Sequence, residues 1–212
     1  MKIEGKKAVV VGGASGMARA AAEQLKAKGA SVAILDLPTS AGAEVAAGLG
    51  GTFHPVDVMD AEGTEQALDA AVEALGGLHI AVNTAGGGTA MRTLGKNGPH
   101  PLDEFRRVID LNLIATFNLN RLQAAHMAKN DPEDDERGVM IDTASIAAFE
   151  GQIGQVAYTA AKAGIAGMML TMARDLGGIG IRAVAIAPSL FSTGITQGIP
   201  DEFAAALTKD AA

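Results

Sequence analysis

The fold of this chain is indicated by residues 7–18, which read KAVVVGGASGMA. The first five residues form a short apolar run, as in a strand that is buried on both faces of a parallel sheet. Gly12 and Gly13 end this run, and an Ala-rich stretch with helical spacing follows. Glycines let the backbone approach a phosphate and a helix N-terminus offers free N–H groups, so this succession favours a phosphate-binding loop. Alone, such a turn can also serve packing only.

The alternation of short apolar strands and helices continues along the chain. Strands are predicted at residues 7–11, 31–36, 52–56, 78–83, 138–143 and 181–187, and helices at 17–28, 41–49, 61–75, 102–129 and 155–176. Six strands joined by helices imply right-handed crossovers. We therefore predict an α/β protein with a Rossmann-like doubly wound parallel β-sheet flanked by helices. There is no internal repeat or linker, so a single domain over residues 1–212 is expected.

The composition excludes several classes of protein. Of the 212 residues, 48% are hydrophobic, which is enough for a sizeable core and excludes a disordered chain. The net charge of −7, with no basic tract, argues against nucleic acid as a partner. The absence of cysteine excludes disulfides, a Cys-ligated zinc site and a thiolate nucleophile, and it fits a reducing compartment. No signal peptide or membrane span is predicted, so we expect a cytoplasmic protein that does not bind membranes.

Other kinds of site find no support in the sequence. The four histidines lack metal-ligand spacing, so no metal site is predicted. There is no Gly-x-Ser-x-Gly elbow, and the glycine-rich loop lacks the Gly-Lys-Ser/Thr ending of a P-loop. The acidic run at residues 130–137 is interpreted as a solvated turn.

Asp36 ends the second predicted strand, 20 residues after Gly16. A carboxylate there can accept hydrogen bonds from the ribose hydroxyls of an adenosine and would repel a 2′-phosphate. The alternative is an Asp that only initiates the turn before Leu37 and Pro38. The loop and the acid together favour a dinucleotide site, and NAD over NADP.

The one tyrosine of the chain, Tyr158, stands four residues before Lys162 in a predicted helix, so both side chains project from one face. An ordinary amphipathic helix can contain the same pair. A free phenol has a pKa of about 10, but a nearby ammonium and a cationic nicotinamide would both favour the phenolate. Tyr158 is therefore a candidate general acid/base.

Two further polar residues occupy suggestive positions. Ser145 follows the predicted strand 138–143, and its hydroxyl could polarise a substrate carbonyl, although it could equally cap a helix. Asn112 lies between two leucines in the predicted helix 102–129, an unfavourable place for an amide unless something binds it.

The loop at residues 86–101 is long for an α/β domain and contains Arg92, Lys96 and His100. Loops at the carboxyl ends of strands tend to carry ligand contacts. A surface insertion is the alternative, and both interpretations stay open.

Taken together, these residues resemble the short-chain dehydrogenase/reductase family over nearly the whole chain. The glycine-rich loop of the family is matched by Gly12, Gly16 and, with a change, Ala18, and its Asn-Ala-Gly-type motif by residues 83–86. The resemblance implies a catalytic tetrad of Asn112, Ser145, Tyr158 and Lys162. It also implies that Tyr158 and Lys162 contact the cofactor together with Gly12, Ser15, Gly16, Met17, Asp36, Leu37, Asp57, Val58, Asn83, Ala85, Gly86, Pro188, Phe191 and Thr193.

The resemblance further implies a role for each member of the tetrad. Ser145 and Tyr158 would bind the substrate oxygen while hydride passes between the carbinol carbon and the nicotinamide. Tyr158 would move the proton, and Lys162 would hold the ribose hydroxyls and lower the pKa of the phenol. Asn112 would anchor a water that relays protons to Lys162.

Residues 32–38, 143–152 and 173–176 look like the type 2 3-hydroxyacyl-CoA dehydrogenase branch of the family. That likeness implies NAD(H), a short 3-hydroxyacyl-CoA or 3-oxoacyl-CoA substrate, and a homotetramer. Arg92 and Lys96 could then meet the CoA phosphates. The alternatives are the same chemistry on a hydroxysteroid or another secondary alcohol, and a non-catalytic NAD-binding scaffold, which would need none of the tetrad.

Members of this family continue for several elements beyond the stretch that corresponds to Ala212. The resemblance therefore implies that a C-terminal strand and helices are missing from these residues. We expect them to lie in a disordered continuation rather than to be lost by truncation, because a missing edge strand would expose the sixth strand.

Overall fold

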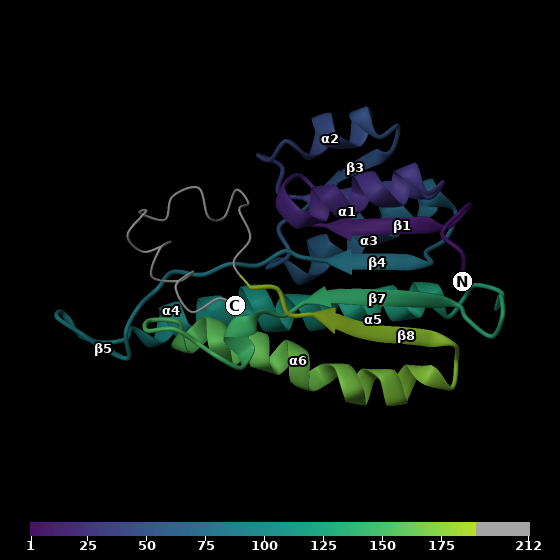
Figure 1. Cartoon of the computed structure of the whole chain (residues 1–212). Helices are drawn as coiled ribbons and strands as arrows, with labels where there is room; N and C mark the ends of the chain where they lie inside the picture. Colours follow the sequence, from purple (N-terminus) through teal and green to yellow (C-terminus); the bar gives the residue numbers. More distant parts are fainter. Residues whose placement is uncertain (190–212) are drawn as a thin grey trace.

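The computed structural model describes residues 1–189, and in this part of the chain a parallel sheet of six strands is the central feature (Figure 1). Its order is β3-β2-β1-β4-β7-β8. The strands are β1 (Lys7–Val11), β2 (Ser31–Asp36), β3 (Thr52–Pro55), β4 (Ile80–Asn83), β7 (Gly138–Thr143) and β8 (Ile181–Ile186). The chain order reverses between β1 and β4, so a crevice is expected at the carboxyl ends of these two strands. The predicted doubly wound parallel sheet is confirmed.

Helices cover both faces of this sheet (Figure 1). They are α1 (Gly16–Ala27), α2 (Gly42–Gly48), α3 (Ala61–Leu75), α4 (Leu102–Ile109), α5 (Ala115–Met127) and α6 (Val156–Gly177). Side chains alternate along β1, so Ala8 and Val10 pack with α1 while Val9 and Val11 belong to the core beneath α3 and α5. The continuous apolar run of β1 is therefore explained by two separate cores.

Most predicted boundaries agree with the structure to within two residues. The α3 helix begins after Asp60, whose carboxylate accepts a hydrogen bond from the Gly63 N–H at 3.1 Å. It ends at Gly76, which has a φ of 71°. Capping aspartates and left-handed glycines mark helix ends in a sequence, and for this reason α3 could be predicted well.

Two predictions of local structure are wrong. The helix expected over residues 102–129 is interrupted by η1, a π-helical turn at Asp110–Ile114 that separates α4 from α5. The stretch 86–101, expected as an irregular loop, contains a small antiparallel hairpin of β5 (Leu94–Gly95) and β6 (Gly98–Pro99). Strands of two residues are too short to show alternation in a sequence.

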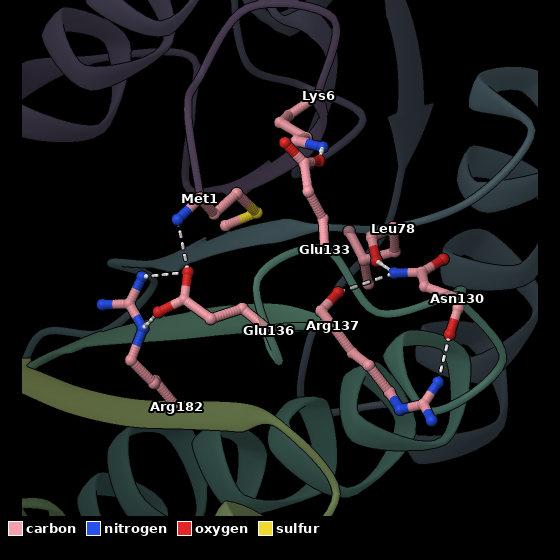
Figure 2. A network of polar contacts seen from close by, with 8 residues as sticks. All are labelled: Met1, Lys6, Leu78, Asn130, Glu133, Glu136, Arg137 and Arg182. Carbon is pink, nitrogen blue, oxygen red and sulfur yellow. Dashed lines mark hydrogen bonds and ion pairs between the residues drawn. The ribbon is translucent and has the colours of Figure 1, made fainter.

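The acidic run 130–137 forms the expected solvated turn, exposed at residues 131–135, and its two ends make further contacts (Figure 2). Glu136 accepts hydrogen bonds from the Met1 amino group at 2.5 Å and forms an ion pair with Arg182 at 2.8 Å. The Asn130 amide donates to the carbonyls of Leu78 at 2.5 Å and of Arg137 at 2.8 Å. These contacts join the start of the chain, the turn before β7 and the edge strand β8. They lie at the amino ends of the strands, opposite the carboxyl ends.

Among the described residues, α6 is the one helix long and apolar enough to cross a membrane, judged by length and composition. The core helix of a soluble protein passes the same test. In this structure α6 packs against β8, α4 and the short turn η2 (Ile146–Ala148).

Candidate active site

A glycine-rich loop joins β1 to α1 at the crevice. Gly12 has a φ of +79°, and a Cβ atom there would lie 2.7 Å from the Thr84 Oγ1. The Thr84 hydroxyl donates to the Val11 carbonyl at 3.0 Å and so fixes the loop against the end of β4. A residue other than glycine would be strained at Gly12 and would also collide with its neighbour.

The N-terminus of α1 has no side-chain cap. Ser15 occupies the N-cap position with extended backbone, but its hydroxyl makes no capping hydrogen bond. The first N–H groups of a helix have no intrahelical partner and carry positive potential. Ser15, Gly16 and Met17 therefore provide backbone groups that suit a pyrophosphate.

Asp36 connects this loop to the end of β2. Its Oδ2 accepts from the Ala14 N–H at 2.9 Å, and its Oδ1 accepts from the Leu37 N–H at 2.7 Å. A carboxylate held in this way can also accept ribose hydroxyls. The nearby Asp57 is exposed and accepts from the Met59 N–H at 3.0 Å, while Val58 is buried. These residues fit a dinucleotide.

Asn112 lies at the centre of the π-helical turn and is fully buried. Its Nδ2 donates to the carbonyls of Gly87 at 2.7 Å and Val108 at 2.8 Å, and its Oδ1 accepts from the Gly87 N–H at 3.0 Å. The amide thus holds the backbone that leaves β4. π-Helical turns frequently occur at functional sites, and this one aims the amide inward.

Lys162 lies on α6 with its ammonium beneath the same loop. It is 3% exposed, and its Nζ donates to the Thr143 carbonyl at 2.7 Å. A Cβ built on Gly86 would lie 2.5 Å from the Asn112 Oδ1 and 3.5 Å from the Lys162 Nζ. The Asn112 amide and the Lys162 ammonium therefore both lie next to Gly86. Burial lowers the pKa of Lys162 to about 8, against an opposing effect of Asp142.

Tyr158 lies one helical turn before Lys162, whose Nζ is 5.5 Å from the centre of the phenol ring. The expectation that the phenol has a lowered pKa is not met in the protein alone. Burial raises the pKa of Tyr158, and a hydrogen bond with Ser145 opposes that rise. The Ser145 Oγ also accepts from the Ala147 N–H at 3.1 Å, so this serine caps η2 as well as facing Tyr158.

Asn83 is a predicted cofactor-binding residue whose side chain points into the protein. Its Nδ2 lies within 3.0 Å of oxygens of Asn120, Gln123 and Asp142, and its Oδ1 accepts from Gln123 at 2.8 Å. Any cofactor contact of Asn83 would involve its backbone. Sequence reasoning missed the three partners, although Asn120 and Gln123 are mid-helix amides, the same signal that identified Asn112.

The remaining predicted residues are placed as follows. The carbonyl of Pro188 accepts from the Ile146 N–H at 2.9 Å, next to Ser145. Phe191 and Thr193 lie outside the described residues. Arg92 and Lys96 are exposed around the β5–β6 hairpin, and the Met91 N–H donates to the Gly154 carbonyl at 2.8 Å, which ties this loop to the segment before α6.

Comparison with known proteins gives consistent results. A family model described as short chain dehydrogenase matches residues 6–203. The 3-hydroxyacyl-CoA dehydrogenase type-2 of Drosophila melanogaster is 48% identical over 95% of this chain and 81% of its own length. The human protein of that name is 47% identical over 94% of this chain and 78% of its own length. The crystal structure of 3-hydroxyacyl-CoA dehydrogenase type-2 from Mycobacterium avium superposes with a TM-score of 0.89 at 42% identity, covering 97% of this chain and 83% of that one. This chain belongs to the short-chain dehydrogenase family and is an oxidoreductase that uses a nicotinamide cofactor.

Proposed function

We propose that this enzyme interconverts short 3-hydroxyacyl-CoA and 3-oxoacyl-CoA thioesters with NAD(H). The observation that carries the reaction is the convergence of Tyr158, Lys162 and Asn112 at the carboxyl ends of β4 and β7, next to a loop that suits a pyrophosphate. The substrate class is supported by the names of the relatives, which share 47–48% of their aligned residues with this chain.

The chain supplies binding groups and a proton relay. A bound nicotinamide dinucleotide supplies or accepts the hydride. Ser145 and Tyr158 bind the substrate oxygen, and Tyr158 gives that oxygen a proton in reduction or takes one in oxidation. Lys162, which is protonated below about pH 8, favours the phenolate and donates to the ribose hydroxyls. Orientation of the two reactants accounts for much of the expected rate gain.

The preference for NAD over NADP is proposed from Asp36. Its two oxygens already accept the N–H groups of Ala14 and Leu37 at 2.9 and 2.7 Å, so the carboxylate cannot turn away from an incoming ribose without breaking these bonds. A 2′-phosphate would meet this negative charge. We expect wild-type turnover with NADH to exceed that with NADPH by about 100-fold or more in kcat/KM, since such a repulsion costs several kcal/mol.

The test is NADH consumption with acetoacetyl-CoA, run beside NADPH and beside Tyr158→Phe. The variant keeps the ring and removes the only tyrosine hydroxyl of the chain. Loss of turnover by about 100-fold to 10,000-fold, with NADH still bound, is expected for a general acid. If NADH binds and acetoacetyl-CoA is not reduced, the substrate is another ketone, such as a steroid. If NADH does not bind, the interpretation of residues 12–18 is wrong.

We also propose that the chain forms a homotetramer in the cytoplasm. The assembly is supported by exposed apolar side chains on η1, α5 and α6, namely Ile114 (54% exposed), Phe117 (49%) and Leu170 (61%). The absence of cysteine fits a reducing compartment. Sedimentation of the 21.4-kDa chain, with Phe117→Glu as the weakened form, tests the assembly, and cell fractionation tests the location.

A further inference from the structure

Two ionisable side chains are fully buried among residues 1–189, and they have opposite charges. Asp142, on β7, is 1% exposed, and Lys162, on α6, is 3% exposed. Buried charged groups are strongly disfavoured unless they are paired or hydrogen-bonded. Lys162 donates its hydrogen bond to the carbonyl of Thr143, the residue directly after Asp142. The ammonium thus sits against the backbone that carries the carboxylate.

The surroundings of Asp142 suit a carboxylate rather than a neutral acid. Its Oδ1 accepts from the Asn83 Nδ2 at 2.9 Å, and its Oδ2 accepts from the Asn120 Nδ2 at 2.6 Å. Both of these partners are N–H donors. Charge-assisted hydrogen bonds of this kind stabilise the ionised form. Burial raises the pKa of Asp142, whereas Asn83, Asn120 and Lys162 oppose the rise.

We propose that Asp142 is a positioning residue of this dehydrogenase, a buried carboxylate that serves as the counter-charge of Lys162 and keeps the ammonium protonated while Tyr158 transfers its proton. The proposal rests on the proposed roles of Tyr158 and Lys162. The oxygens of Asp142 are bound by Asn83 and Asn120, so this carboxylate acts through the lysine.

Other charged groups near α6 are exposed or already paired. On α4, Arg106 pairs with Asp103 and Arg107 with Glu104, and on η1 Asp110 is exposed. On α5, Arg121 is bonded to Asn118 and His126 to Asp69. Arg174 and Asp175 on α6 are exposed, and Arg182 on β8 pairs with Glu136. Exposed charges are screened by solvent. Besides burial, Asp142 is the one group in the described chain that shifts the pKa of Lys162.

The sign of the effect follows from this geometry. Removing a nearby negative charge destabilises an ammonium and stabilises a phenolate, so it lowers the pKa of both Lys162 and Tyr158. Reduction of a ketone needs both groups protonated. The alkaline fall of kcat/KM for reduction is therefore expected at lower pH in Asp142→Asn, by about one pH unit, which is a tenfold loss on that limb. Replacing a residue that only supports the fold would lower activity at every pH without changing the pH at which kcat/KM falls.

The experiment compares the pH profile of acetoacetyl-CoA reduction in wild type, Asp142→Asn and the swap Asp142→Asn/Asn120→Asp. The swap keeps one carboxylate in the buried network and moves it across a single 2.6 Å hydrogen bond. The swap is expected to return the alkaline fall of kcat/KM toward the pH at which it occurs in wild type. Gln123→Leu is the control, because it breaks both hydrogen bonds with Asn83 and changes no charge. It should lower the melting temperature and leave the alkaline fall of kcat/KM at the same pH.

Two outcomes would overturn the proposal: an Asp142→Asn profile that superimposes on wild type, or a swap that leaves the limb where Asp142→Asn put it. NADH affinity against pH, read by fluorescence, gives the same limb without substrate and separates this test from a wrong substrate. If Asp142→Asn does not fold, carbon-13 NMR of aspartate-labelled wild type decides. The proposal requires the Asp142 carboxyl to be ionised at neutral pH and its carbon-13 chemical shift to change again near pH 8, where Lys162 titrates. A protonated Asp142 carboxyl at neutral pH refutes the proposal.

Discussion

Asn112 and Gly87 exchange two hydrogen bonds, side chain to backbone in both directions. The Asn112 Nδ2 donates to the Gly87 carbonyl at 2.7 Å, and the Gly87 N–H donates to the Asn112 Oδ1 at 3.0 Å. This reciprocal pair holds the segment that leaves β4 over the Lys162 ammonium. The π-helical turn is what makes the pair possible, because it directs the amide into the crevice.

Asn112→Ala should therefore disturb both the fold and the reaction. It removes three hydrogen bonds, two to the backbone of Gly87 and a buried one to the Val108 carbonyl. We expect the free energy of unfolding to fall by about 2–4 kcal/mol, measured with urea, and turnover to fall at least about tenfold. Asn97→Ala, an exposed amide of the hairpin turn, is the matched control. Unfolding unchanged from wild type in Asn112→Ala would contradict this account.

Gly12 and Gly5 offer a matched pair that separates backbone strain from lack of space. Both have positive φ, +79° and +74°, but a Cβ on Gly12 would lie 2.7 Å from the Thr84 Oγ1, whereas nothing lies within 4 Å of one on Gly5. Each Ala variant should lose about 1 kcal/mol of stability from strain. Only Gly12→Ala should also weaken NADH binding, by about tenfold or more in fluorescence titration, because the loop must shift. Equal NADH affinity in the two variants would show that the loop does not hold the cofactor.

Much of the framework was predictable from local chemistry. The strand β1 has a continuous apolar run because its alternate side chains enter two cores. The two ends of α3 are predicted by its capping residues, Asp60 and Gly76. Asp36 and the Tyr158–Lys162 pair were found because their spacing along the chain is short and their chemistry is distinctive.

The missed features depend on contacts between distant segments. Nothing within residues 102–129 predicts a π-helical turn, and the bonds that its central residue Asn112 makes with Gly87 span 25 residues of sequence. Asp142 looks like an ordinary polar residue near a strand end until Asn83 and Asn120, 59 and 22 residues away, are seen to bind it. The raised pKa of Tyr158 in the protein alone also depends on tertiary packing, because burial outweighs the hydrogen bond with Ser145.

The pKa of Lys162 predicts how the reaction depends on pH. Burial places it at about 8, below the ordinary 10.5, so the ammonium is present below pH 8 and lost above it. We expect kcat/KM for NADH-dependent reduction to fall through about pH 8, with a tenfold loss for each further unit. The same group affects stability in the opposite sense. The free-energy penalty of burying the ammonium is fully present below pH 8 and disappears toward 10.5, so stability should rise there and unfolding does not explain the loss. A flat profile between pH 7 and 9 would contradict the assignment.

The hairpin provides the sharpest test of the substrate class. Arg92 and Lys96 are exposed on a loop that is tied to the segment before α6 by the Met91–Gly154 hydrogen bond. If they meet the phosphates of a CoA ester, replacing both with Ala should raise KM for acetoacetyl-CoA by about 5- to 30-fold, since each exposed ion pair contributes up to about 1 kcal/mol. The KM for a small ketone without phosphates should not change, and the difference should shrink at high salt. Lys28→Ala/Lys129→Ala removes two exposed charges elsewhere and should leave both values at wild type. An unchanged KM for the CoA ester in the hairpin variant would instead identify the hairpin as a surface insertion.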